Sequence, residues 1–67
     1  MSVAKVSELI SESSKSFEDA INQGVARATK TLRNVTGAWV ESQKVTIRDG
    51  KIVNYRVFLK VTFVLDD

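Results

Sequence analysis

The clearest alternation of apolar and polar residues lies in the last third of the chain. From Val53 to Leu65 every second residue is apolar, which is the pattern of a strand that buries one of its two faces. The apolar positions are Val53, Tyr55, Val57, Leu59, Val61, Phe63 and Leu65. The residues between them mix charged, polar and apolar side chains. We therefore expect a strand over 52–65 with one face against the core and a second face of mixed character.

A second β-rich run, 38–47, precedes this strand and is joined to it by residues 48–51, whose sequence is Arg-Asp-Gly-Lys. Asp-Gly between two such runs is a strong signal for a hairpin with a two-residue turn. We therefore expect a long antiparallel hairpin in which Arg48 pairs with Lys51.

The register of this hairpin determines which side chains share a face. Regular pairing outward from the turn sets Trp39 opposite Lys60 and Gln43 opposite Arg56. Both pairs then lie on the sheet face turned away from the core, whereas Lys44 lies on the core side. One β-bulge would change every pair beyond it, so this register is an expectation for the structure to test.

A helix is predicted before the hairpin. Ser16 to Asp19 has the Ser-x-x-acidic form of a capping box, so we expect Ser16 to be the N-cap and the helix to run to about Asn34. Its apolar positions follow helical spacing. They are Phe17, Ala20, Ile21, Gly24, Val25, Ala28 and Leu32. Glycine costs helix stability, so Gly24 within this stripe indicates a close approach of helix and sheet.

The first residues complete a β-α-β-β order. Residues 2–11 are apolar and β-branched enough to form a strand, with 12–15 as the loop to the helix. We expect one domain, 1–67, of the α+β class, with a long twisted sheet curled around a single helix.

One helix covers only one face of a sheet, and the opposite face is too apolar to be left in water. On the expected register that face includes Trp39, Val45, Ile47, Ile52 and Phe58. Another copy of the chain could cover it, and this alternative is favoured because aromatic residues are common at interfaces. A flat aromatic ligand stacked on the indole of Trp39 is the second alternative.

Composition narrows the functional classes. The chain of 67 residues has no cysteine and no histidine, which excludes disulfides and the common zinc sites and leaves association as the way to support a thin core. A catalytic nucleophile motif and a Gly-rich phosphate loop are also absent, so we expect no enzyme. The net charge is only +2 and the basic residues are dispersed, so no nucleic-acid partner is expected. Without a signal-peptide pattern or a long apolar run, we expect a cytoplasmic protein with no membrane partner.

Several segments together resemble the dodecin family. They are MSVAKVSELI, SFEDAI, ARATKTLRNV, ESQKV, DGKI and YRVFLKVTF, and their order and spacing span nearly the whole chain. The resemblance implies a three-stranded antiparallel sheet folded about one helix and a hollow homo-dodecamer of cubic symmetry. It also implies flavin binding without catalysis, in which isoalloxazine rings are sandwiched between tryptophans of symmetry-related subunits. Flavin storage is the function that this implies.

The positions of the family's flavin-binding residues are changed in this chain. Counting from Asn34 and Val35, the resemblance places the stacking tryptophan at Gly37 and a flavin-binding glutamine at Arg56. A basic position late in 38–47 is kept as Lys44. Trp39 lies two residues beyond Gly37, about 6 to 7 Å along a strand and on the same face, and therefore is a candidate for a shifted stacking platform.

Two functions follow as hypotheses. In the first, a homo-dodecamer binds FMN or riboflavin, with candidate ligand contacts from the set Trp39, Arg56, Gln43, Gly37 and Lys44. In the second, a structural or calcium-binding assembly has lost the flavin site. Candidate oxygen ligands for calcium are Glu8, Glu12, Glu18, Asp19, Asp66 and Asp67, although no EF-hand-like loop groups them.

Overall fold

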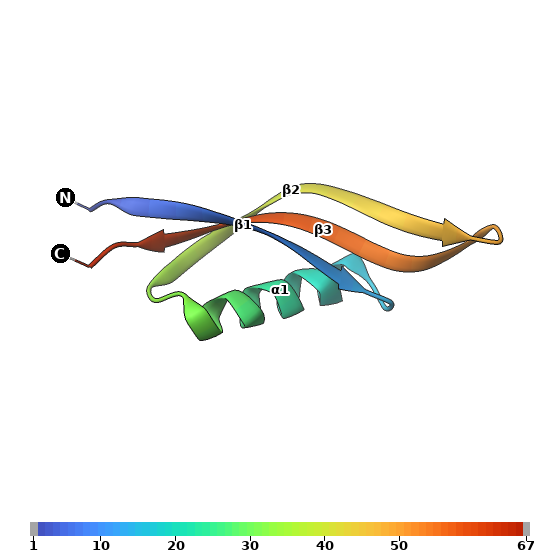
Figure 1. Cartoon of the computed structure of the whole chain (residues 1–67), viewed down its shortest axis with the longest axis horizontal. Coiled ribbons are helices and arrows are strands. Elements are labelled where there is room, and N and C mark those ends of the chain that lie inside the picture. The colour runs from blue at the N-terminus through green and yellow to red at the C-terminus, as the bar shows by residue number, and fades with distance from the viewer. Residues whose placement is uncertain (1, 67) are drawn as a thin grey trace.

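The computed structural model describes residues 2–66 and has the predicted β-α-β-β order. Strand β1 spans Ala4–Ser13, helix α1 Phe17–Thr31, strand β2 Val35–Arg48 and strand β3 Lys51–Val64. The three strands form one antiparallel sheet in the order β1-β3-β2. Helix α1 lies along one face of this sheet, and the β2–β3 hairpin extends well past it (Figure 1). The α+β fold expected from the sequence is confirmed.

The core lies between α1 and the central strand β3. Val57, Leu59 and Val61 are almost completely buried, together with Ala20 and Ala28 of the helix. This confirms the alternation predicted for β3, because the buried strand residues are two apart. The pattern does not extend to its expected end, since Leu65 lies beyond β3 and is exposed.

Helix α1 begins where the sequence predicts and ends earlier. The Ser16 hydroxyl accepts a hydrogen bond from the Asp19 backbone N–H at 2.9 Å, as a helix N-cap does. The helix stops at Thr31, because Leu32 is extended and Asn34 adopts a left-handed backbone with φ of 61°. The Asn34 amide then donates to the Val64 carbonyl oxygen at 3.1 Å. Asparagine tolerates this conformation, and its side chain fastens the start of β2 to the end of β3.

Strand β1 continues two residues further than the sequence predicts. Glu12 and Ser13, assigned to a loop from the sequence, pair with Arg56 and Tyr55 of β3. An ion pair between Glu12 and Arg56 accompanies this extension, with the Arg56 Nε 2.7 Å from the Glu12 Oε1. The loop predicted over 12–15 is therefore displaced, and residues 14–16 connect β1 to α1.

Asp19 joins the end of β1 to the first turn of α1. Its carboxylate accepts hydrogen bonds from the Ser13 hydroxyl and, at 2.6 Å, from the Gln23 amide. The hydrogen bond from Ser13 is the main reason that the pKa of Asp19 lies below its usual value. Burial acts in the opposite direction and is outweighed.

This lowered pKa predicts a pH-dependent contribution to stability. The contribution is complete above the pKa of Asp19 in the unfolded chain and is lost as the pH falls through the lower pKa of the folded chain. We expect Asp19→Asn to remove it, so that the stability difference between wild type and variant shrinks as the pH falls below the ordinary carboxyl pKa of 3.8. Denaturant unfolding at each pH measures this difference. Glu18→Gln is the control, and a wild-type minus Asp19→Asn difference that stays constant with pH would contradict the prediction.

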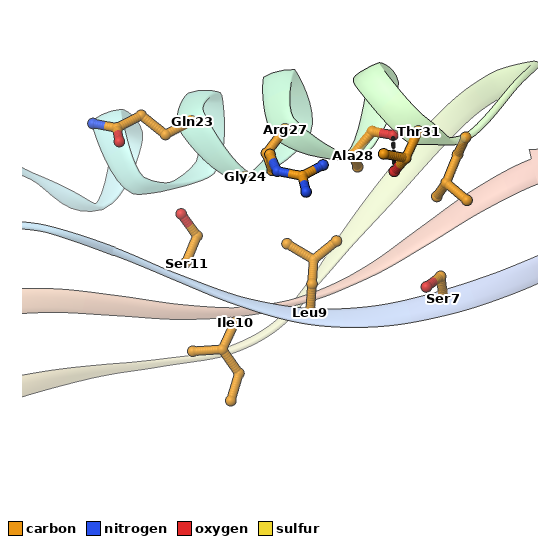
Figure 2. Close-up of a pocket in the computed structure, with 10 residues that line it drawn as sticks. Ser7, Leu9, Ile10, Ser11, Gln23, Gly24, Arg27, Ala28 and Thr31 are labelled. Carbon is orange, nitrogen blue, oxygen red and sulfur yellow. Dashed lines mark hydrogen bonds between the residues drawn. The ribbon is translucent and has the colours of Figure 1, made fainter.

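Gly24 permits the close approach of helix and sheet that its position predicts. A Cβ atom added there would lie 2.8 Å from the Leu59 Cδ1 and 3.1 Å from the Ser11 Cβ. Figure 2 shows Leu9 and Ser11 directed from β1 toward this part of the helix. Any larger side chain at this position would have to displace packed residues.

The turn of the hairpin is as predicted, but its register is not regular. Asp49 and Gly50 both have positive φ, at 52° and 75°, and Arg48 pairs with Lys51. These values match a two-residue type I′ turn. The ladder then shifts between Thr46 and Ile47 and shifts back between Val40 and Ser42.

These two bulges decide which β2 residues share a face. Between them, Gln43 pairs with Val57 and Lys44 pairs with Arg56, so the expected pair of Gln43 with Arg56 is wrong. Directly paired residues lie on the same face. Gln43 therefore lies on the helix side and Lys44 on the opposite side, the reverse of the expectation. Val45, expected on the far face, likewise lies on the helix side because it pairs with Tyr55.

Beyond the second bulge the expected register is restored. Trp39 pairs with Lys60, as predicted, and Gly37 pairs with Thr62. A third irregularity falls between Val35 and Gly37. The placement of the tryptophan away from the helix is therefore confirmed.

Candidate binding site on the uncovered sheet face

The face of the sheet turned away from α1, called here the uncovered face, displays apolar and charged side chains side by side. The register assigns to it Val6, Glu8, Ile10 and Glu12 of β1, Arg56, Phe58, Lys60 and Thr62 of β3, and Gly37, Trp39, Ser42 and Lys44 of β2. Val6, Ile10 and Trp39 are exposed large hydrophobic residues. Such a mixture is typical of a surface that contacts a ligand or another subunit.

Trp39 lies within a cluster of charged side chains. The Lys60 Nζ lies 5.4 Å from the centroid of the Trp39 ring, within the range of a cation–π interaction. The same Nζ is 3.8 Å from the Glu8 Oε1 and 3.7 Å from the Glu41 Oε1. Lys60 is thus placed by one acidic residue from each neighbouring strand.

The bulge in β2 supplies one of these carboxylates. Glu41 is the extra residue between Val40, which pairs with Leu59, and Ser42, which pairs with Phe58. From this position the Glu41 carboxylate lies 3.7 Å from the Lys60 Nζ.

An open hollow of about 620 Å³ adjoins this cluster. Its lining residues are Val6, Ser7, Glu8, Trp39, Lys60 and Thr62. Trp39 is 66% exposed, so most of the indole surface is available for contact. Gly37 neighbours the hollow through its partner Thr62, and a Cβ atom at Gly37 would meet nothing within 4 Å. The hollow therefore combines an aromatic surface, apolar walls and a few polar groups, as small-molecule sites do.

The candidate residues predicted from the sequence do not all meet at this hollow. Trp39 lines it and Gly37 borders it, whereas Arg56 and Lys44 form a pair on the same face, four residues further along β3 from Lys60. That separation corresponds to about 13 Å along a strand. Arg56 is held there by Glu12. Gln43 lies on the helix side, so within one subunit it is not beside Trp39.

The sequence analysis did not select Glu41, Val6 or Thr62, and it named Glu8 only as a candidate calcium ligand. From Val6 to Glu12 the even-numbered residues of β1 alternate apolar and acidic side chains, and this signal could have placed Glu8 near Lys60 once β1 was paired with β3. Glu41 lies two residues from Trp39, so regular pairing from the turn already places it on the far face, diagonal to Lys60.

A second hollow, of about 520 Å³, lies between α1 and β1. In Figure 2, Ser7, Leu9 and Ser11 point toward the helix, whereas Ile10 points away from it. Gly24, Ala28 and other small or aliphatic residues line much of this space, so it is mainly a gap in helix–sheet packing.

The acidic residues considered as calcium ligands are dispersed. Within residues 2–66 no three of them lie close enough together to hold a metal ion, and Asp67 lies outside the described residues. Glu8 and Glu12 face Lys60 and Arg56 instead. In the same described part of the chain, no helix has the length and apolar character needed to cross a membrane.

The fold is that of a small protein in which one helix covers one face of a three-stranded sheet. The other face carries the candidate binding site. Comparison with known proteins identifies the family. The family model described as Dodecin matches residues 3–66. A dodecin from Thermus thermophilus is 37% identical over 65 residues, with 97% of this chain and 94% of that protein covered. The chain belongs to the dodecin family.

Solved structures agree with this assignment. A variant of the T. thermophilus dodecin superposes with a TM-score of 0.93 at 36% identity, with both chains fully covered. The dodecin from Streptomyces coelicolor gives a TM-score of 0.93 at 29% identity, covering 98% of this chain and 94% of its own. The calcium dodecin of Mycobacterium tuberculosis, an antigen with a novel calcium-binding site, gives a TM-score of 0.82 at 34% identity, covering 96% of this chain and 91% of its own.

Family membership confirms several expectations from the sequence. Dodecins are small flavin-binding assemblies that form dodecamers, and they bind small molecules without catalysis. The chain is accordingly a homo-oligomeric binding protein and not an enzyme.

Proposed function

We propose that this chain forms a homo-dodecamer that stores or sequesters a flavin, FMN or riboflavin, by stacking it on Trp39 at subunit interfaces. One observation carries the proposal: a 66% exposed indole lies on the uncovered face beside an open hollow. Membership of a flavin-binding family supports the choice of ligand.

The surroundings of the indole favour stacking. Lys60 approaches the ring and is itself placed by Glu8 and Glu41, so the tryptophan has a defined neighbour on its own sheet. The rest of the ring is free to contact a flat ligand, since aromatic systems pair in offset-stacked arrangements. Gly37 adds open space on the same face, two residues away.

The other candidate contacts are assigned to more distant positions. Arg56 and Lys44 lie outside the hollow, about 13 Å along the sheet from Lys60, and Arg56 is already ion-paired with Glu12. Gln43 lies on the other side of the sheet, so its contact with the ligand requires a neighbouring subunit. The site therefore rests chiefly on Trp39.

Flavin titration tests the function directly. Stacking of an isoalloxazine ring on an indole quenches flavin fluorescence, so we expect riboflavin or FMN fluorescence to fall as micromolar protein is added. A flavin band in the visible spectrum of the purified protein would give the same answer without added ligand. Unquenched fluorescence of both flavins, together with a colourless sample, would reject the proposal.

Calcium binding is the second candidate, because of the similarity to the M. tuberculosis calcium dodecin. Within the described residues a single chain offers no cluster of carboxylates, so a calcium site would have to be shared between subunits. Dissociation or destabilisation of the assembly by a chelator would support this candidate. Stability that is unchanged by chelator would argue against a structural metal. The cytoplasmic location, and the absence of nucleic-acid and membrane partners, stay predictions.

A further inference from the structure

The hollow beside Trp39 is electrostatically unlike a phosphate site. Its cluster contains the carboxylates of Glu8 and Glu41 and the single ammonium of Lys60. At neutral pH one negative charge remains uncompensated. The acidic groups are also the more accessible ones, since the side chains of Glu8 and Glu41 are 72% and 48% exposed and that of Lys60 is 31% exposed. Glu8 lines the hollow itself, and Glu41 adds its charge 3.7 Å from the Lys60 Nζ, which also lines it.

The nearest other cations on the uncovered face do not compensate this charge. Among the described residues that line the hollow, Lys60 is the single basic side chain. Arg56 is paired with Glu12, and Lys44 lies beside Arg56 at the same distance along the sheet, about 13 Å from Lys60. Within one subunit, a phosphate beside Trp39 would thus be close to two carboxylates and distant from the Arg56–Lys44 pair.

We propose that the Trp39 hollow selects flavins that lack a phosphate group over flavin phosphates, with Glu8 and Glu41 as the specificity-determining residues. This inference rests on the proposed flavin-binding function. The uncharged isoalloxazine ring stacks on the indole, while hydroxyl groups of a ribityl chain donate hydrogen bonds to the carboxylates. A terminal phosphate, by contrast, is repelled by the residual negative charge.

Affinities for riboflavin and FMN test the selectivity. We expect riboflavin to bind about fivefold more tightly than FMN at low ionic strength, and the ratio to fall toward about twofold at physiological salt, because the repulsion acts through solvent and is screened. Fluorescence quenching titrations of both flavins against the assembled protein give the two dissociation constants.

Charge-removing variants identify the residues responsible. Glu8→Gln and Glu41→Gln keep the size of each side chain, and we expect each to reduce the preference for riboflavin, mainly by strengthening FMN binding. Glu18→Gln removes one carboxylate from the helix on the other side of the sheet, and is expected to leave the ratio unchanged.

Two results would overturn the inference. The first is FMN binding as tightly as riboflavin in the wild type. The second is a preference for riboflavin that neither Glu8→Gln nor Glu41→Gln reduces. Absence of binding by both flavins is a different result, because it rejects the proposed function itself and the selectivity with it.

Discussion

Replacing Trp39 by alanine is expected to weaken flavin binding by about 5- to 150-fold. The physical reason is the loss of the aromatic surface beside the hollow, because stacking of a planar ring on an aromatic side chain contributes about 1 to 3 kcal/mol. The measurement is the dissociation constant of riboflavin from fluorescence quenching, with size-exclusion chromatography to verify that the variant still assembles.

Ile47→Ala is the matched control for this experiment. Ile47 is an exposed apolar residue of the same strand and the same sheet face, and it lies outside the hollow. We expect it to leave the affinity close to that of the wild type. Unchanged affinity in Trp39→Ala would show that the indole is not the stacking platform, and would direct attention back to the open position at Gly37.

Replacing Gly24 by valine is expected to destabilise the folded protein by about 2 kcal/mol or more. The first carbon of the new side chain would lie 2.8 Å from the Leu59 Cδ1, and Leu59 is almost fully buried. Overpacking of a well-packed core costs about 1 to 3 kcal/mol, and the two further carbons of valine enlarge the displacement. The denaturant midpoint at a fixed protein concentration measures the loss.

Ala26→Val is the control for the helix propensity of valine. Ala26 lies in the same helix and is exposed, so the substitution adds a β-branched residue without the contact to Leu59. We expect a loss of about 0.5 kcal/mol there. Equal losses at Gly24 and Ala26 would contradict the close helix–sheet approach.

Local signals in the sequence predicted most of the fold. The N-cap Ser16, the Asp-Gly turn and the spacing of Val57, Leu59 and Val61 each depend on neighbouring residues alone, and all three are confirmed. The helix end was placed three residues too late, at Asn34 and not at Thr31. The residues up to Asn34 keep a helical pattern, and the sequence does not reveal the positive φ of Asn34.

The candidate site was less predictable, because it depends on register. Trp39 was placed correctly opposite Lys60 although two bulges intervene, since the second shift reverses the first. Gln43 and Lys44 lie between the shifts and were therefore assigned to the wrong faces. Bulges are set by the fit of the whole sheet and leave no distinct trace in residue type, so the reversed faces of Gln43 and Lys44 could not be predicted.

The hairpin that extends past α1 has a further consequence. Strand β1 pairs with β3 only as far as Tyr55, so the tip of the hairpin is two strands wide, with Ile47 and Ile52 exposed. A two-stranded ribbon is marginally stable in water. We expect the tip to be stabilised where subunits pack against it, and folding would then be coupled to assembly by mass action. Dilution would then loosen the architecture of each subunit as well as the contacts between subunits.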